Sequence, residues 1–112
     1  MYALVFSKVI REDIDSSYTY IKETLEAPHA AENLIKDIVE KLEYIKKTPY
    51  ARSLVHDNYL TSLGIRSIKI KNYVLYYNVE EEKKSINIIR FFYNKRDWIK
   101  LLKEKTLEEL MK

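Results

Sequence analysis

Cationic and aromatic side chains gather in the second half of the sequence, in a pattern typical of a surface that binds a polyanion. Lys69 and Lys71 alternate with isoleucines in a strand-like stretch, and Lys95, Arg96 and Trp98 follow the last strongly apolar stretch. Lys and Arg neutralise phosphates, Arg through two hydrogen bonds at once, and aromatic rings stack on unpaired bases. We therefore predict one basic, aromatic-edged surface built from both stretches.

The net charge of +3 is distributed unevenly along the chain. Residues 1–65 carry eight basic and ten acidic groups, whereas residues 66–105 carry eleven basic and five acidic groups. A positive field on a small domain favours nucleic acid or another polyanion as the partner. The alternative is an ordinary solvated surface, in which Lys69 and Lys71 are the wet side of a half-exposed sheet.

Other candidate binding residues also have structural alternatives. Arg66 has the same alternation as Ile68 and Ile70, so it either contacts the ligand or pairs with a carboxylate at the sheet edge. Trp98 either edges the basic surface or anchors a last helix. For the tyrosine rings that could contact nucleic acid, core or cross-strand packing is the first expectation and base stacking the second. These rings are Tyr73, Tyr76, Tyr77 and Tyr93.

The composition excludes several classes of site. The chain has no cysteine, which excludes disulfides, thiolate zinc sites and a cysteine nucleophile. His29 and His56 are far apart in the sequence and indicate no metal pair. A single glycine excludes a glycine-rich phosphate-binding loop. We therefore predict a protein that uses neither a metal ion nor a cofactor.

The hydrophobic pattern predicts one α+β domain over residues 1–112, in which a helical hairpin covers one face of a mostly antiparallel sheet. Gly64 is expected in a turn with positive φ, and Asn72 in a tight turn. The expected elements are a strand at 2–6, a helix from Asp13, a helix between Pro28 and Pro49, a short edge strand at 52–55, strands at 65–71, 73–79 and 85–93, and a last helix from Asp97.

The sequence also carries a prediction about location. No stretch approaches the ~18 apolar residues that a membrane-spanning helix needs, and the first ten residues lack the features of a secretory signal. Together with the absence of cysteine, this predicts a cytoplasmic protein without a membrane partner.

An ordered set of residues extends along most of the chain. The set consists of Tyr20-Ile21 and Leu25; Pro28 with Ala30-Ala31 and Leu34; Gly64-Ile65-Arg66; Lys71-Asn72-Tyr73 with Tyr77 and Val79; and Ile88, Arg90, Tyr93 and Lys95-Arg96-Asp97-Trp98. In this order the set resembles the RelE/ParE superfamily, the toxins of bacterial type II toxin–antitoxin systems.

The resemblance implies a RelE/ParE-like fold and a cognate antitoxin as the partner. RelE-like members cut messenger RNA on the ribosome, whereas ParE-like members share the fold and inhibit DNA gyrase. In RelE-like cleavage the ribose 2′-OH attacks the adjacent phosphate, so clustered cations must stabilise a dianionic phosphorane without a metal. The resemblance assigns this catalytic role to Lys69, Lys71 and Arg96. The predicted RNA-binding residues are Arg66, Tyr93, Lys95 and Trp98.

Two positions depart from the RelE-like nuclease pattern. Val74 stands where those nucleases usually have an arginine, and Leu102 stands where RelE carries a tyrosine. Three hypotheses follow: a RelE-like endoribonuclease, which we expect first; a ParE-like gyrase inhibitor without chemistry; and a degenerate toxin that acts only as the antitoxin's partner. The nuclease hypothesis predicts that Lys69, Lys71 and Arg96 converge on one phosphate.

Overall fold

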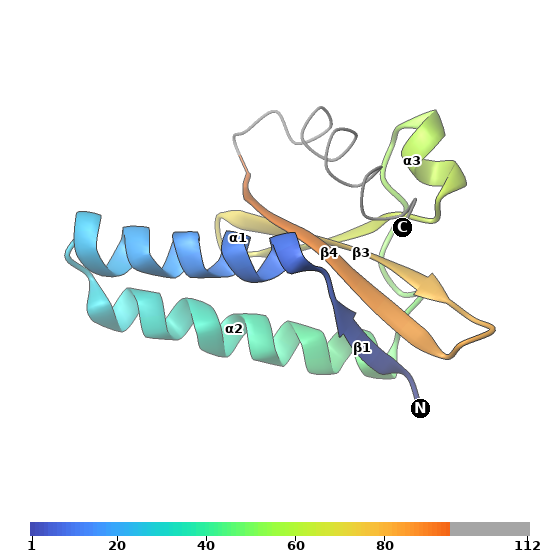
Figure 1. Ribbon diagram of the computed structural model, residues 1–112, viewed down its shortest axis with the longest axis horizontal. Coiled ribbons are helices and arrows are strands. Elements are labelled where there is room, and N and C mark those ends of the chain that lie inside the picture. The colour runs from blue at the N-terminus through green and yellow to red at the C-terminus, as the bar shows by residue number, and fades with distance from the viewer. Residues whose placement is uncertain (95–112) are drawn as a thin grey trace.

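Residues 1–94 are described by the computed structural model, and they form a four-stranded sheet with a helical hairpin against one face (Figure 1). This is the predicted α+β architecture. The last helix expected from Asp97 lies outside the described residues. In chain order the elements are β1 (Ala3–Phe6), α1 (Lys8–Thr19), the π-helical turn η1 (Tyr20–Thr24), α2 (Pro28–Lys47), α3 (Asn58–Ser62), β2 (Arg66–Ile70), β3 (Tyr73–Glu80) and β4 (Ser85–Tyr93).

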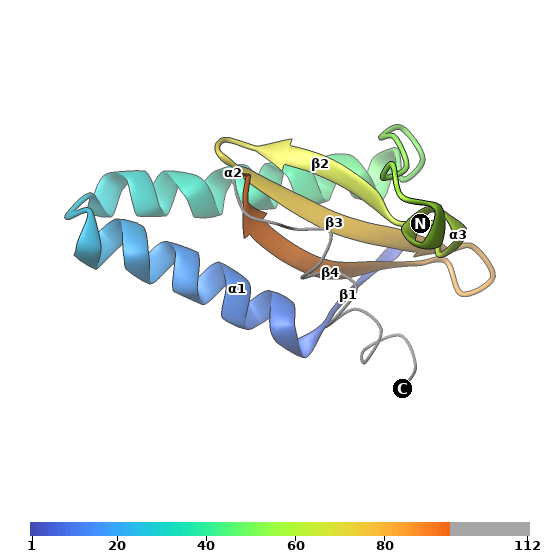
Figure 2. The same cartoon turned by 90° about the horizontal axis from the view of Figure 1, so that it is seen from above.

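The sheet is mostly antiparallel, as predicted, with the strand order β1-β4-β3-β2. Figure 2 shows β4 between β1 and β3. Only β1 runs parallel to its neighbour, β4, because α1 and α2 separate it from the antiparallel strands. The edge strand expected at 52–55 is reduced to a single bridge between Leu54 and Arg66. Gly64 has a φ of 72°, which confirms its predicted turn.

The first helix begins earlier than its apolar stripe indicates. We expected it from Asp13, but α1 starts at Lys8 with Ser7 as its N-cap. The Ser7 hydroxyl accepts a hydrogen bond of 3.0 Å from the backbone N–H of Ile10. The cap satisfies a donor that the helix cannot pair internally, and Ile10 becomes the first buried residue of the stripe.

The second helix begins and ends where its prolines indicate. Pro28 occupies the first turn of α2, where a missing N–H costs nothing, and the helix ends at Lys47 before Pro49. The predicted apolar stripe packs on the sheet. Its buried residues are Ala31, Leu34, Ile38, Leu42 and Ile45.

Each face of the sheet has its own apolar core. The larger core joins the helical hairpin to side chains such as Ile68, Leu75 and Ile88. On the other face, Leu60 of α3 and its neighbours pack against Tyr76 and other residues in a smaller core. The sequence analysis missed α3 and left this face open and basic, so that expectation is corrected: the second face is partly apolar and covered.

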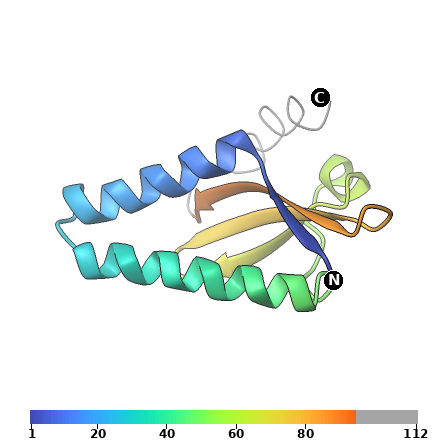
Figure 3. The ribbon, with the colours of Figure 1, turned by 60° about the horizontal axis from the view of Figure 1, so that its bottom comes forward.

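The hairpin is longer than the sheet that it covers. Figure 3 shows the blue and teal helices continuing past the ends of the yellow and orange strands. The tip of the hairpin therefore extends beyond the strands, whereas the buried stripe of α2 from Leu34 to Ile45 packs in one core with the sheet. Within residues 1–94, no helix is both long enough and apolar enough to span a membrane.

Candidate functional site

The two predicted catalytic lysines lie on opposite sides of the sheet. Lys69 is opposite Val74 in the β2–β3 ladder, and Val74 packs against the smaller core on the face away from the hairpin. Lys71 lies in the turn between these strands with a φ of 54°. Its ammonium is 3.2 Å from the Asp37 carboxylate of α2, on the hairpin side.

The separation has a simple backbone cause. We expected Lys69 and Lys71 to share a face because side chains two residues apart in a strand do so. The strand ends at Ile70, so the alternation does not reach Lys71. Asp37 then screens the charge of Lys71, whereas Lys69 has no ion pair within the described residues. Arg96, the third predicted catalytic cation, lies outside residues 1–94.

Arg66 is held by neutral groups. It is opposite Tyr77 in the ladder, on the side of the sheet that faces the hairpin. One of its guanidinium nitrogens donates a 2.5 Å hydrogen bond to the carbonyl of Arg52, and its guanidinium lies 5.2 Å from the centre of the Tyr50 ring. Neither predicted role, a carboxylate partner or a nucleic-acid ligand, is shown by these contacts, and RNA binding by Arg66 stays a prediction.

The predicted aromatic residues divide into packed and exposed rings. Tyr73, Tyr76 and Tyr77 are buried, so the packing alternative is confirmed for them. Tyr93 is 40% exposed at the end of β4, with its ring edge 5.5 Å from Tyr73. Contact with RNA remains a prediction for Tyr93. Lys95 and Trp98, the remaining RNA-binding candidates, lie outside the described residues.

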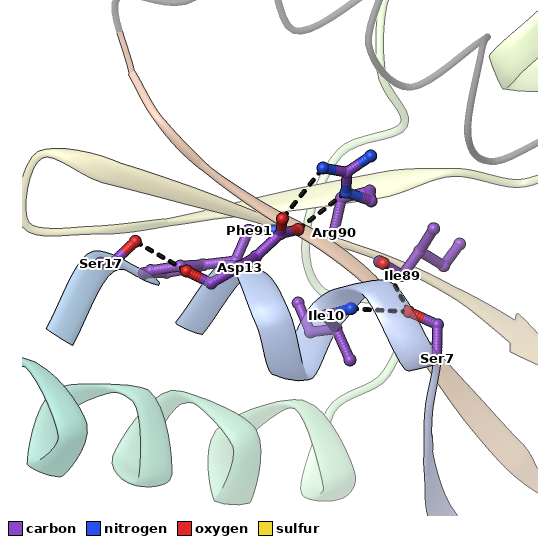
Figure 4. Close-up of polar contacts among 7 residues, drawn as sticks. All are labelled: Ser7, Ile10, Asp13, Ser17, Ile89, Arg90 and Phe91. Carbon is purple, nitrogen blue, oxygen red and sulfur yellow. Dashed lines mark hydrogen bonds and ion pairs between the residues drawn. The ribbon is translucent and has the colours of Figure 1, made fainter. Parts of the chain in front are cut away.

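A buried ion pair between α1 and β4 is the strongest polar feature that the sequence analysis missed (Figure 4). Arg90 is only 7% exposed and binds Asp13 through two hydrogen bonds, from Nε to Oδ2 at 2.7 Å and from Nη2 to Oδ1 at 2.9 Å. The backbone N–H of Phe91 donates to the same carboxylate at 3.0 Å. An arginine within an otherwise apolar strand was the signal, because a buried charge requires a partner.

The same region fixes the edge of β4 beyond the end of β1. The pairing of β1 with β4 ends at Phe6 and Ile88. The Ser7 hydroxyl then donates to the carbonyl of Ile89 at 2.8 Å, and Asp13, nearly two turns further along the chain, accepts from the N–H of Phe91. Polar side chains of α1 thus replace a strand at this edge and set the position of the hairpin on the sheet.

Tyr77 carries a buried hydroxyl with no hydrogen-bond partner in the described part of the chain. Burial raises the pKa of Tyr77 to about 12, although the positive charges of Arg66 and Arg52 act in the opposite direction. An unpaired buried hydroxyl costs free energy, so this group is a local weakness of the larger core.

Comparisons with known proteins agree with this fold and place the chain in a family. The chain is similar to a protein of the chromosomal ParDE toxin–antitoxin system from P. aeruginosa, with 21% identity, a TM-score of 0.67, and coverage of 83% of this chain and 96% of the other. It is also similar to a chain of the RelBE2 complex from Mycobacterium tuberculosis, with 17% identity, a TM-score of 0.55, and coverage of 82% and 96%.

A further similar structure is the isolated RelE toxin from E. coli, with 21% identity, a TM-score of 0.51, and coverage of 96% and 99%. No curated protein sequence matches the chain at a comparable level of significance. The model for the ParE toxin of the type II toxin–antitoxin system parDE matches residues 4–98, which is most of the sequence. The chain therefore belongs to the ParE toxin family of type II toxin–antitoxin systems.

Proposed function

We propose that this toxin acts as ParE-like proteins do, by binding DNA gyrase, and not by cutting RNA. The observation that carries the proposal is the divergence of Lys69 and Lys71. A nuclease of the RelE type needs several cations around one phosphate, because the transition state gathers two negative charges on it. A lysine on each side of the sheet does not supply that arrangement.

Two further features support a binding function. The charge of Lys71 is already screened by Asp37, and this leaves less of it for a phosphate. Val74, opposite Lys69, is an apolar residue at the position where RelE-like nucleases usually have an arginine. A surface without this cation can still bind a protein target, since binding requires no stabilised transition state.

A cognate antitoxin is the second partner that we propose. Two of the similar structures are described as toxin–antitoxin complexes, RelBE2 and RelBE, and a third as a chromosomal ParDE system. An antitoxin that binds only the folded toxin would raise its stability by mass action. We expect the melting temperature of the toxin to rise on addition of the antitoxin, in proportion to the logarithm of its concentration.

Expression in bacteria without an antitoxin tests the proposed target. We expect growth arrest with induction of a DNA-damage reporter and with intact transcripts when RNA 5′ ends are mapped. Lys69→Ala and Lys71→Ala should remain as toxic as Lys83→Ala, a matched control at an exposed lysine in the β3–β4 turn. New transcript ends that disappear in Lys69→Ala, Lys71→Ala and Arg96→Ala would establish the nuclease instead, and harmless expression would support a degenerate toxin.

A further inference from the structure

Two arginines lie together where the loop after α2 meets the edge strand β2. The backbone of Leu54 forms a bridge with Arg66, the first residue of β2, and the carbonyl of Arg52 accepts a 2.5 Å hydrogen bond from the Arg66 guanidinium. Figure 2 shows the end of α2 and the loop that follows it beside this outermost strand. Arg52 and Arg66 are therefore neighbours in space, although they are 14 positions apart in the sequence.

The two arginines are held without a counter-charge. Within residues 1–94 neither forms an ion pair, and the Arg66 guanidinium is positioned by the Arg52 carbonyl and the Tyr50 ring. A carbonyl and a ring fix a guanidinium but leave its net charge in place. Burial raises the pKa of Tyr77, and the charges of Arg66 and Arg52 both oppose that rise. Both positive charges thus act on the same buried hydroxyl.

Lys47, the last residue of α2, adds a third cation at this end of the molecule. Its side chain is exposed, and a tight turn leads from it to Arg52. In this turn the N–H of Ala51 donates to the carbonyl of Thr48 at 3.2 Å. We call Lys47, Arg52 and Arg66 the basic cluster.

The carboxylates of this part of the sequence are engaged by other groups. Residues 41–66 contain five lysines and arginines but only two carboxylates. Glu43 lies 3.7 Å from Lys46, and Asp57 is the N-cap of α3. Adjacent like charges repel each other, so an anion between the two guanidiniums would be attracted by both and would offset their repulsion. The basic cluster therefore has the charge and the rigidity of an anion-binding site.

The aromatic rings at the basic cluster do not form a platform for unpaired bases. One face of the Tyr50 ring is covered by Arg66, and its hydroxyl approaches Glu81, which is bound by Lys84 at 3.0 Å. Tyr77 is fully buried. Single-stranded nucleic acid is bound largely by stacking, whereas a duplex needs only contacts with its phosphates. Among nucleic acids, the site therefore fits a duplex better than a single strand.

We propose that the basic cluster binds the phosphate backbone of duplex DNA without reading its sequence. The guanidinium of Arg66, already held in place, would bind two phosphate oxygens, and Arg52 and Lys47 would neutralise the same phosphate or its neighbour. An acidic protein segment offers carboxylates to the same cations, but DNA is favoured because gyrase, the proposed target, acts on duplex DNA. This choice of ligand rests on the proposed function, whereas the anion site rests on the basic cluster alone.

Fluorescence anisotropy of a labelled 20-base-pair DNA duplex, titrated with the purified full-length toxin, tests the proposal. The titration is made at 50 mM salt and repeated at rising salt concentrations. Neutralisation by three cations should give a slope of about −3 for the logarithm of the affinity against the logarithm of the salt concentration. A second duplex of unrelated sequence should bind within about threefold of the first, and a single strand of the same length should bind more weakly.

Each variant is compared with an arginine outside the basic cluster. Arg66→Gln and Arg52→Gln should each weaken duplex binding about tenfold and reduce the salt slope by about one. Arg11→Gln, at an exposed arginine of α1, should change binding less than about twofold. Arg66→Lys keeps the charge without the paired donors and should weaken binding about threefold. Circular dichroism checks folding, and Arg52→Gln, at an exposed side chain, decides if Arg66→Gln is unfolded.

Five outcomes would overturn the proposal. They are no binding of the duplex at 50 mM salt, equal binding by wild type, Arg52→Gln and Arg66→Gln, tighter binding of the single strand than of the duplex, tighter binding of poly-glutamate than of the duplex, and complete displacement of the duplex by 10 mM inorganic phosphate at constant ionic strength. Poly-glutamate would assign the basic cluster to an acidic protein segment, and inorganic phosphate would assign it to a free anion.

The assay contains no gyrase, so the two proposals fail separately. A toxin that inhibits supercoiling but does not bind the duplex would contradict only the role of the basic cluster. A toxin that binds the duplex through Arg52 and Arg66 but leaves supercoiling unimpaired would contradict only the proposed target.

Discussion

The two ends of the helical hairpin differ in how they are held. Near the start of α1, Ser7 and Asp13 fix the helix to the edge of β4, and Ile10 is fully buried. At the far end, Tyr20 and Leu25 are half exposed around a cleft, and the helix ends in a π-helical turn. The start of α1 is thus fixed by burial and polar contacts, whereas the turn that follows the helix leaves Tyr20 and Leu25 half exposed.

This difference follows from where the sheet ends. Side chains at the near end exchange water for apolar neighbours and paired charges, so removing them leaves cavities or unpaired groups. Tyr20 and Leu25 at the far end remain about half in water, so removing either side chain changes little in the folded state. Substitutions should therefore separate the two ends by their effect on the free energy of unfolding.

The largest expected loss of stability follows from breaking the buried ion pair between Asp13 and Arg90. Asp13→Ala leaves the Arg90 guanidinium buried without its counter-charge and should lower the free energy of unfolding by about 3–5 kcal/mol in urea denaturation. Asp15→Ala, at an exposed carboxylate two residues away, should change it by less than about 0.5 kcal/mol. Equal effects at the two positions would show that the pair does not hold the near end.

Apolar truncation sharpens the same contrast. Ile10→Ala should cost about 2–5 kcal/mol, because it opens a cavity in the larger core. Leu25→Ala should cost less than about 0.5 kcal/mol, because the side chain is already more than half in water. Thermal and urea denaturation of both variants checks this, and a large loss of stability in Leu25→Ala would mean that the far end of the hairpin belongs to the folding core.

The cap of α1 should have an intermediate effect. Ser7→Ala removes the hydrogen bond to the N–H of Ile10 and the one to the carbonyl of Ile89, and should cost about 1–2 kcal/mol. Ser62→Ala is the matched control, since within residues 1–94 that hydroxyl bonds only to the carbonyl of Tyr59 in the short helix α3. If Ser7→Ala and Ser62→Ala lower the free energy of unfolding equally, the edge of β4 does not depend on Ser7.

The smallest expected effect is an increase in the free energy of unfolding. Tyr77→Phe removes a buried hydroxyl without a partner and should raise the free energy of unfolding by about 1 kcal/mol at neutral pH. The pKa of Tyr77 is about 12 in the folded protein, above the ordinary 10.0, so between these values the folded state keeps a proton that the unfolded state loses. The free energy of unfolding of the wild type therefore does not depend on this group below pH 10 and falls as the pH rises to 12. Tyr77→Phe should lose less stability over that range. Parallel pH profiles for the two proteins would contradict the assignment.

Much of the fold was predictable because its signals are local. The prolines at 28 and 49 bound α2. Alternation identified β2, and runs of apolar, aromatic and β-branched residues identified β3 and β4 almost to their ends. The predicted start of α1 was wrong by five residues because the prediction followed the apolar stripe, to which the N-cap Ser7 does not contribute. The short α3 was missed because a five-residue helix held by Asp57 and Leu60 has no period to detect.

The candidate site was less predictable because its geometry depends on turns and long-range pairs. A single residue past the strand end reversed the side on which Lys71 lies. The Asp13–Arg90 pair joins residues 77 positions apart, and no spacing rule connects them. The sequence analysis did not use Arg90, an arginine in an apolar strand, as a sign of a buried partner, and only the fold shows that this partner is Asp13.

A supercoiling assay with purified components tests the proposed function most directly. Wild-type toxin is added to DNA gyrase with relaxed plasmid and, separately, to translating ribosomes with a defined messenger RNA. We expect the toxin to inhibit supercoiling at a concentration that leaves the messenger RNA intact, and Lys69→Ala to behave as the wild type does. Cleavage of the messenger RNA with unimpaired supercoiling would contradict the proposal.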